Sequence, residues 1–138
     1  MKPSSNTESN PIKRYVESAL NKVYREDMSL IEREASERAI VFRFGLYLYE
    51  ILKSTEFKDY DVDVEYNRNG YDAKRIPSRQ NGSYPDLIIH CRTSNEFNIL
   101  VLEFKTEWSN ESQEEDERKI RDFLDKSGVY KFRYGATI

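Results

Sequence analysis

Residues 98–105, Asn-Ile-Leu-Val-Leu-Glu-Phe-Lys (NILVLEFK), are an apolar run that ends in an acid and a lysine. A short apolar run of this kind is typical of a strand buried on both faces. Glu103 and Lys105 are two positions apart, so on a strand both side chains project from one face, roughly 6–7 Å apart along the chain. A strand end that reaches water with an incidental ion pair is the plain interpretation. Burying an acid and a base is costly unless something uses or partners them, so both are candidate site residues.

The acid-x-lysine pattern alone carries little information, because it occurs four times in the chain. The copy at 56–58 repeats the letters EFK but stands among Ser, Thr and Asp, which predicts a solvated turn. The copy at 72–74 lies in a polar loop. The copy at 117–119 lies on a charged helix, where residues two apart do not face each other. Only the copy at 103–105 ends an apolar strand.

Length and composition predict a single soluble domain over residues 10–138, after a disordered polar tail at 1–9. The chain has 138 residues, a formal net charge of −3 and one cysteine, Cys91. That cysteine excludes an internal disulfide and a cysteine-rich zinc site and fits a reducing cytoplasm. No segment has the length of a membrane span or the form of a signal peptide. The abrupt end at a strand is consistent with a truncated chain.

Helical periodicity dominates the first third of the chain. Asn10 before Pro11 has the form of an N-cap followed by proline at the first helical position, and it predicts a helix over 11–26. Ser29 with Glu32 has the form of a capping box and predicts a second helix that runs to about Lys53. The middle of this second helix is apolar nearly all round, which predicts burial between layers.

The rest of the chain predicts four strands and one helix, giving an α/β (α+β) fold with a mixed four-stranded sheet flanked by helices. The predicted order is a strand at 60–67, a long loop at 67–85, strands at 86–91 and 98–104, a charged helix at 109–127 that stops at Gly128, and a strand at 129–138. The first three strands form an antiparallel meander. The last strand joins through a helical crossover.

Asp86 opens the strand before NILVLEFK, directly after Pro85. If the two strands pair as a hairpin, Asp86 lies beside Glu103 and Lys105 at one edge of the sheet. Two carboxylates, with the backbone carbonyl of Phe104, are suitable ligands for Mg²⁺, with Mn²⁺ as a substitute. Lys105 would then orient or deprotonate a metal-activated water, or neutralise charge on a phosphodiester under attack.

Three further residues are candidates for the same region. Glu65 ends the first strand, and Glu37 stands where the apolar stretch of the second helix begins. Each is either a supporting acid or an ordinary ion-pair partner. His90 is on the strand of Asp86; a lone histidine is usually a hydrogen-bonded core residue, but it can also pair with a site acid.

The residues YPD at 84–86, sixteen intervening positions and EFK at 103–105 resemble the PD-(D/E)xK nuclease superfamily, which has the restriction-endonuclease-like fold. The expected element order is similar to the αβββαβ core of that superfamily over residues 30–138. SERAIVFRFGLYLYEIL, VDVEYNRNG, YPDLIIH and NILVLEFKTEWSN resemble an uncharacterised subgroup of its predicted nucleases.

That resemblance implies Mg²⁺-dependent hydrolysis of nucleic-acid phosphodiesters. It implies that Asp86 and Glu103 bind metal and that Lys105 is the catalytic lysine. Glu37 and Glu65 would be supporting acids, and Glu65 a further metal ligand. The Q-x-x-x-Y motif of the exonuclease branch is absent after the lysine.

Cations in the loop before Asp86 are candidates for binding nucleic acid: Arg68, Lys74, Arg75 and Arg79. Such loops contact phosphates, although a solvated loop has the same composition. The acidic run ESQEEDE at 111–117 would repel nucleic acid and is expected to face away from the site. Lys119, on the same helix, is either a site residue or part of a solvated face.

Two functions therefore stand. The first is a metal-dependent nuclease that acts on nucleic acid, most simply DNA, with a homodimer as one way to clamp a duplex. The second is a non-catalytic binding module or accessory subunit of the same fold, which the negative net charge favours. A nucleotide triphosphatase is excluded because the chain has no glycine-rich phosphate loop.

Overall fold

The fold was obtained as a computed structural model, which describes residues 10–66, 85–92, 94–106, 113–125 and 132–138, with the backbone of 2–3, 68–69 and 72–73. The elements are α1 (Pro11–Glu26), α2 (Met28–Glu32), α3 (Glu37–Leu52), α4 (Gln113–Leu124), β1 (Lys2–Pro3), β2 (Asp61–Val64), β3 (Arg68–Asn69), β4 (Asp72–Ala73), β5 (Leu87–His90), β6 (Leu100–Glu103) and β7 (Tyr134–Thr137).

The predicted mixed sheet is confirmed, with strand order β1-β7-β6-β5-β2. Strands β2, β5 and β6 form the expected antiparallel meander, and β7 pairs parallel to β6 after the crossover through α4. Strand β1 pairs antiparallel with β7, although Lys2 and Pro3 fall in the segment predicted to be disordered. Strands β3 and β4 form a separate two-stranded sheet within the predicted long loop.

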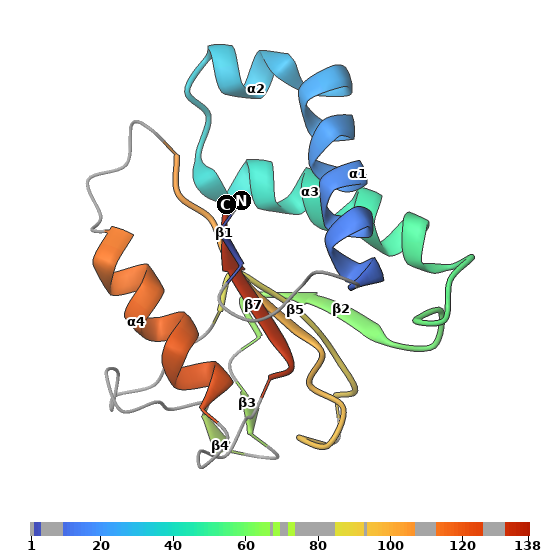
Figure 1. Cartoon of the computed structure of the whole chain (residues 1–138). Coiled ribbons are helices and arrows are strands. Elements are labelled where there is room, and N and C mark those ends of the chain that lie inside the picture. The colour runs from blue at the N-terminus through green and yellow to red at the C-terminus, as the bar shows by residue number, and fades with distance from the viewer. Residues whose placement is uncertain are drawn as a thin grey trace.

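The sheet separates two hydrophobic layers (Figure 1), with α1 and α3 on one face and α4 on the other. Alternate residues of the central strands face opposite layers. Leu87 and Leu102 join the cluster beneath α1 and α3, whereas Ile88 and Val101 join the cluster beneath α4. Because both faces of β5 and β6 are covered, their sequences are apolar without alternation.

Helix α1 has the predicted bounds, and the Asn10 side chain accepts a hydrogen bond from the amide of Ile12 as the N-cap expectation requires. The prediction of one helix from Ser29 to Lys53 is wrong. The chain leaves α2 through Glu34, whose φ of 51° lies in the left-handed region. Ser36 then caps α3, accepting from the amide of Ala39 at 3.2 Å, so a local side-chain bond starts a new helix.

The capping box expected at Ser29 and Glu32 is also absent from the structure. Helix α2 begins at Met28 after Asp27, and that N-cap residue makes no side-chain capping bond. In the part of the chain that is described, no helix is both long and apolar enough to cross a membrane.

Gly135 of β7 permits the close approach of α4 to the sheet. A Cβ atom at this position would lie 2.8 Å from Cγ2 of Ile120 and 3.2 Å from side-chain atoms of Leu124 and Val101. A contact of 2.8 Å is shorter than carbon atoms tolerate, so a larger residue requires α4 to move. The glycine therefore sets the height of α4 above β6 and β7.

We expect Gly135→Ala to lower the free energy of unfolding by about 1–3 kcal/mol, because the added methyl overpacks the layer beneath α4. Gly45→Ala is the matched control. Among the described residues, its Cβ would meet side-chain atoms of Leu87 and Val64, at 3.3 and 3.6 Å. Alanine also favours the helix by about 1 kcal/mol over glycine, so this control should change stability by no more than about that amount. Urea denaturation of both variants measures the difference, and equal stabilities would contradict the overpacking argument.

Candidate active site

The pairing of β5 with β6 brings Asp86 beside Glu103. Leu87 lies opposite Leu102, and one step further along the register the two acids are neighbours. The amide of Asp86 donates to Oε1 of Glu103 at 3.4 Å. The amide of Phe104 donates to Oδ2 of Asp86 at 2.7 Å. The expected meeting of these two acids at one edge of the sheet is therefore present.

Glu103 is buried, with 3% of its surface exposed. Burial raises the pKa of the Glu103 carboxyl well above its usual range, and the negative charge of Asp86 raises it further. Lys119 opposes both effects, because its ammonium favours the ionised carboxylate. A cation near Glu103 is therefore needed if Asp86 and Glu103 are both to be ionised.

Two ion pairs connect the end of β6 to α4. The ammonium nitrogen of Lys119 lies 2.9 Å from Oε1 of Glu103, and that of Lys105 lies 3.3 Å from Oδ2 of Asp116. Asp116 and Lys119 are both buried. Glu103 and Lys105, two residues apart at the end of β6, therefore face Lys119 and Asp116, three residues apart on α4. We call these four residues (Glu103, Lys105, Asp116 and Lys119) the ionic ladder.

The ladder corrects one expectation about the charged helix. Asp116 belongs to the acidic run expected to face away, yet it points at β6. Of the two alternatives for Lys119, the structure gives contact with Glu103 and not a solvated face. Glu114 and Glu115 are exposed as predicted. The overlooked signal is spacing: Asp116 and Lys119 continue the buried stripe of Ile120 and Phe123 at helical intervals.

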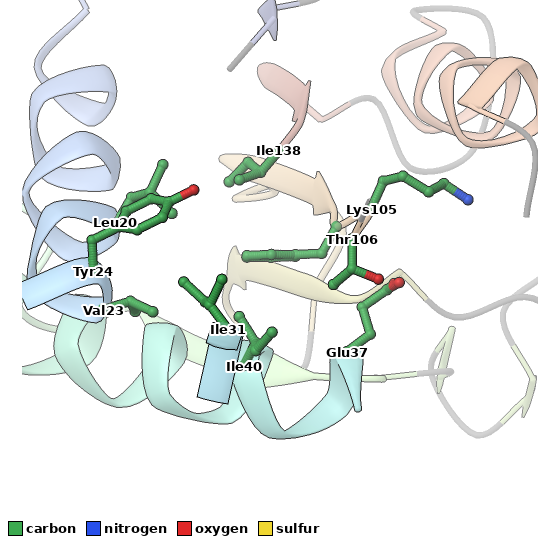
Figure 2. A pocket seen from close by; sticks show the side chains of 10 residues that line it. Leu20, Val23, Tyr24, Ile31, Glu37, Ile40, Lys105, Thr106 and Ile138 are labelled. Atoms are coloured by element: carbon green, nitrogen blue, oxygen red, sulfur yellow. The ribbon is translucent and has the colours of Figure 1, made fainter. Parts of the chain in front are cut away.

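Glu37 lies in the first turn of α3 and lines a cavity of about 260 Å³ next to the ladder. Figure 2 shows Glu37 and Thr106 at one end of this cavity, while the Lys105 side chain extends away from it. The remaining walls are mostly apolar and come from α1, α2, α3 and the ends of β6 and β7: Leu20, Val23, Tyr24, Ile31, Ile40, Phe104 and Ile138. Glu37 therefore approaches the site from the face of the sheet opposite α4.

Glu65 is tied to the site through its backbone. Its amide donates to the carbonyl of Asp86 at 3.1 Å, and its φ of 53° is in the left-handed region. Its carboxylate accepts from Nε of Arg38 at 3.1 Å on α3. The structure thus places Glu65 beside Asp86 but directs its side chain into an exposed ion pair.

His90 does not join Asp86, because it occupies the other end of β5. Its Nε2 lies 2.7 Å from Oδ2 of Asp63, and its ring packs edge-on against Tyr66. Arg92 completes this cluster with two hydrogen bonds to Asp63, at 2.8 and 3.0 Å. Of the two alternatives for His90, the structure therefore shows the hydrogen-bonded core residue, with Asp63 as its partner.

The four loop cations belong to the segment between β2 and β5. The backbone of Arg68 lies in β3, and Lys74, Arg75 and Arg79 fall outside the described residues. The expected stop at Gly128 is outside them as well.

Phe104 holds the end of β6 in position. Its ring packs edge-on against Phe44 of α3, with 5.0 Å between ring centroids. Glu103 and Lys105 bond through their backbones to Ile138 beside β7, so the backbone groups of Phe104 point to the β5 side. Its carbonyl is therefore on the side of Asp86.

Among the described residues, no three His, Cys, Asp or Glu side chains are grouped so that they could hold a metal ion. The predicted ligand set of Asp86, Glu103 and the Phe104 carbonyl contains two such side chains and stays a prediction. Comparisons with protein-family models, with curated proteins and with solved structures give no match.

The cluster around Asp63 generates a prediction about acid stability. Burial raises the pKa of Asp63, but hydrogen bonds from His90 and Arg92 outweigh it and lower the pKa to about 2, from 3.8. Because the pKa of Asp63 is lower in the folded protein than in the unfolded chain, the ionised carboxylate stabilises the fold at a pH above about 4. This contribution is lost as the pH falls from about 4 through about 2. We expect Asp63→Asn to remove about 2 kcal/mol of unfolding free energy at pH 7 and less with falling pH. Urea denaturation at pH 7, 4 and 3 measures it.

Asp59→Asn is the control for this experiment, because Asp59 is an exposed acid in the turn before β2. It should change stability by less than about 0.5 kcal/mol at each pH. If the loss of unfolding free energy caused by Asp63→Asn does not shrink as the pH falls, ionised Asp63 is not the stabilising species.

Proposed function

We propose that this protein is a metal-dependent nuclease of the restriction-endonuclease-like, PD-(D/E)xK type, which hydrolyses phosphodiesters of nucleic acid, most simply DNA. The observation that carries the proposal is the contact of Asp86 with Glu103 where β5 begins and β6 ends, with Lys105 two residues further along and directed, like Glu103, towards α4. The order of three strands, a crossover helix and a fourth strand supports the αβββαβ interpretation of the fold.

The donor set fits Mg²⁺ or Mn²⁺. Mg²⁺ is commonly bound by one or two carboxylates together with waters and substrate phosphates, so two acids and a carbonyl suffice. Asp86 and the ladder contain three carboxylates and two ammonium groups, hence a formal charge of −1. A divalent cation and a phosphodiester would together raise this charge only to zero. When bound, the metal would supply an activated water and polarise the phosphoryl oxygen.

The chain's own residues would have distinct roles. Asp86 and Glu103 hold the cation, and the amide of Phe104 orients the Asp86 carboxylate through its hydrogen bond. Lys105, the ammonium paired with Asp116, neutralises charge on the attacked phosphate. Glu37 and Glu65 flank this edge as supporting acids, and loop cations hold the nucleic-acid backbone.

The second candidate is a non-catalytic binding module or accessory subunit. The observation favouring it is the ladder itself: Glu103 and Lys105 each have an oppositely charged partner on α4. An ionic joint that only fastens a helix would have the same pairs. The net charge of −3 also favours it, unless two copies clamp a duplex between their loops.

Cleavage assays with Mg²⁺ or Mn²⁺ on duplex, single-stranded, junction and flap substrates of DNA and RNA separate the two candidates. We expect cleavage that EDTA abolishes and that Lys105→Met lowers about 100-fold or more, since the ammonium acts on the reacting groups. Methionine keeps the apolar stem of the lysine.

The chain contains its own matched control. Lys58→Met alters the second EFK segment, where the lysine is exposed, and should leave cleavage unchanged. Circular dichroism and melting temperature verify that both variants fold. If no substrate is cut, or if Lys105→Met cuts as fast as the original protein, the binding module is the better description.

A further inference from the structure

We propose that Lys119 is an internal cation that occupies Glu103 in the metal-free protein, and that a divalent metal displaces it. Metal binding would then break the ion pair of Lys119 with Glu103, one of the two described above between α4 and the end of β6. This inference rests on the proposed function, because it concerns the same carboxylate pair, and it adds a device that couples the metal to the helix.

The position of Lys119 supports the exchange. Its nitrogen lies 2.9 Å from Oε1 of Glu103, and the side chains of Lys119 and Glu103 are 10% and 4% exposed. A divalent ion held by Glu103 and Asp86 would be repelled by this ammonium, with little water to screen the two charges. Both cations neutralise the same buried carboxylate, so the binding of one weakens the binding of the other.

The remaining contacts allow Lys119 to leave without the release of α4. The second ladder pair, Lys105 with Asp116, is one helical turn towards the N-terminus of α4. Ile120 and Phe123 remain packed on the strands in the cluster that contains Ile88 and Val101. Lysine also has a long flexible stem, so its ammonium can turn outward while α4 stays on the sheet, and only the turn around Lys119 loses a stabilising contact. The expected change is therefore confined to the turn of α4 around Lys119.

Two measurements on the full chain with MnCl₂ alone, without nucleic acid, test the exchange. Isothermal titration calorimetry of Lys119→Gln should give an affinity about tenfold or more above that of the original protein, since the variant removes the competing positive charge that lies 2.9 Å from Oε1 of Glu103. Hydrogen exchange should show that Mn²⁺ accelerates exchange of amides around Lys119 in the original protein. In Lys119→Gln this acceleration should be lost.

Two control variants separate exchange from general electrostatics. Arg118→Gln removes a neighbouring exposed cation and should leave Mn²⁺ affinity within about twofold, because surface charges are screened. Lys119→Arg keeps the cation and should keep the weaker affinity. If Lys119→Gln does not fold, Lys119→Met replaces it, because it buries no unpaired polar group.

The outcomes distinguish this inference from the proposed function. Unchanged or weaker Mn²⁺ binding by Lys119→Gln, or protection of α4 by Mn²⁺, would overturn the exchange even if the protein cuts DNA. Tighter binding with metal-accelerated exchange in α4 would support it even if no nucleic acid is cut. Absence of Mn²⁺ binding by both proteins would overturn both ideas.

Discussion

Strands β5 and β6 pair antiparallel through the middle of the molecule, and each of their residues faces one of two helical layers. The pairing of Leu87 with Leu102 turns both leucines towards α1 and α3 and brings Asp86 beside Glu103. A slip of one residue would exchange the faces of one whole strand and move its charged end into the opposite layer. Hydrophobic burial on both faces opposes that slip, so the apolar core and the acid pair depend on one register.

The ionic ladder depends on this register and on the height of α4. Breaking a buried ion pair is costly, although a formed pair contributes little net stability compared with apolar packing. The ladder is therefore better suited to specifying where α4 sits than to holding the protein folded. Two of its residues, Glu103 and Lys105, are also those to which we assign roles in the proposed hydrolysis, so the structural joint and the proposed site share the end of β6. The same geometry keeps both candidate functions open to experiment.

Much of the architecture follows from local pattern. The period of two in β2, the apolar runs of β5 and β6, and the Asn10 cap of α1 are local signals, and each element forms where it was expected. The break between α2 and α3 was missed because Glu34 adopts a left-handed backbone that is rare for glutamate and has no sequence signature. His90 was ambiguous because either end of a strand can supply a partner, and only the pairing of β2 with β5 brings Asp63 to it.

The sequence by itself determined the strand faces, and with them the shared side of Glu103 and Lys105, because side chains alternate along any strand. It also made Asp86 a neighbour of Glu103 once the hairpin was assumed. Only the tertiary structure decided the partners of those charges. Asp116 and Lys119 lie on α4, and the packing of Ile120 over Gly135 sets the rotation and height of this helix. Gly135 belongs to β7, so it is distant from both residues along the chain. Ion pairs require their atoms within about 4 Å, and that precision comes from packing between layers, which no local pattern contains.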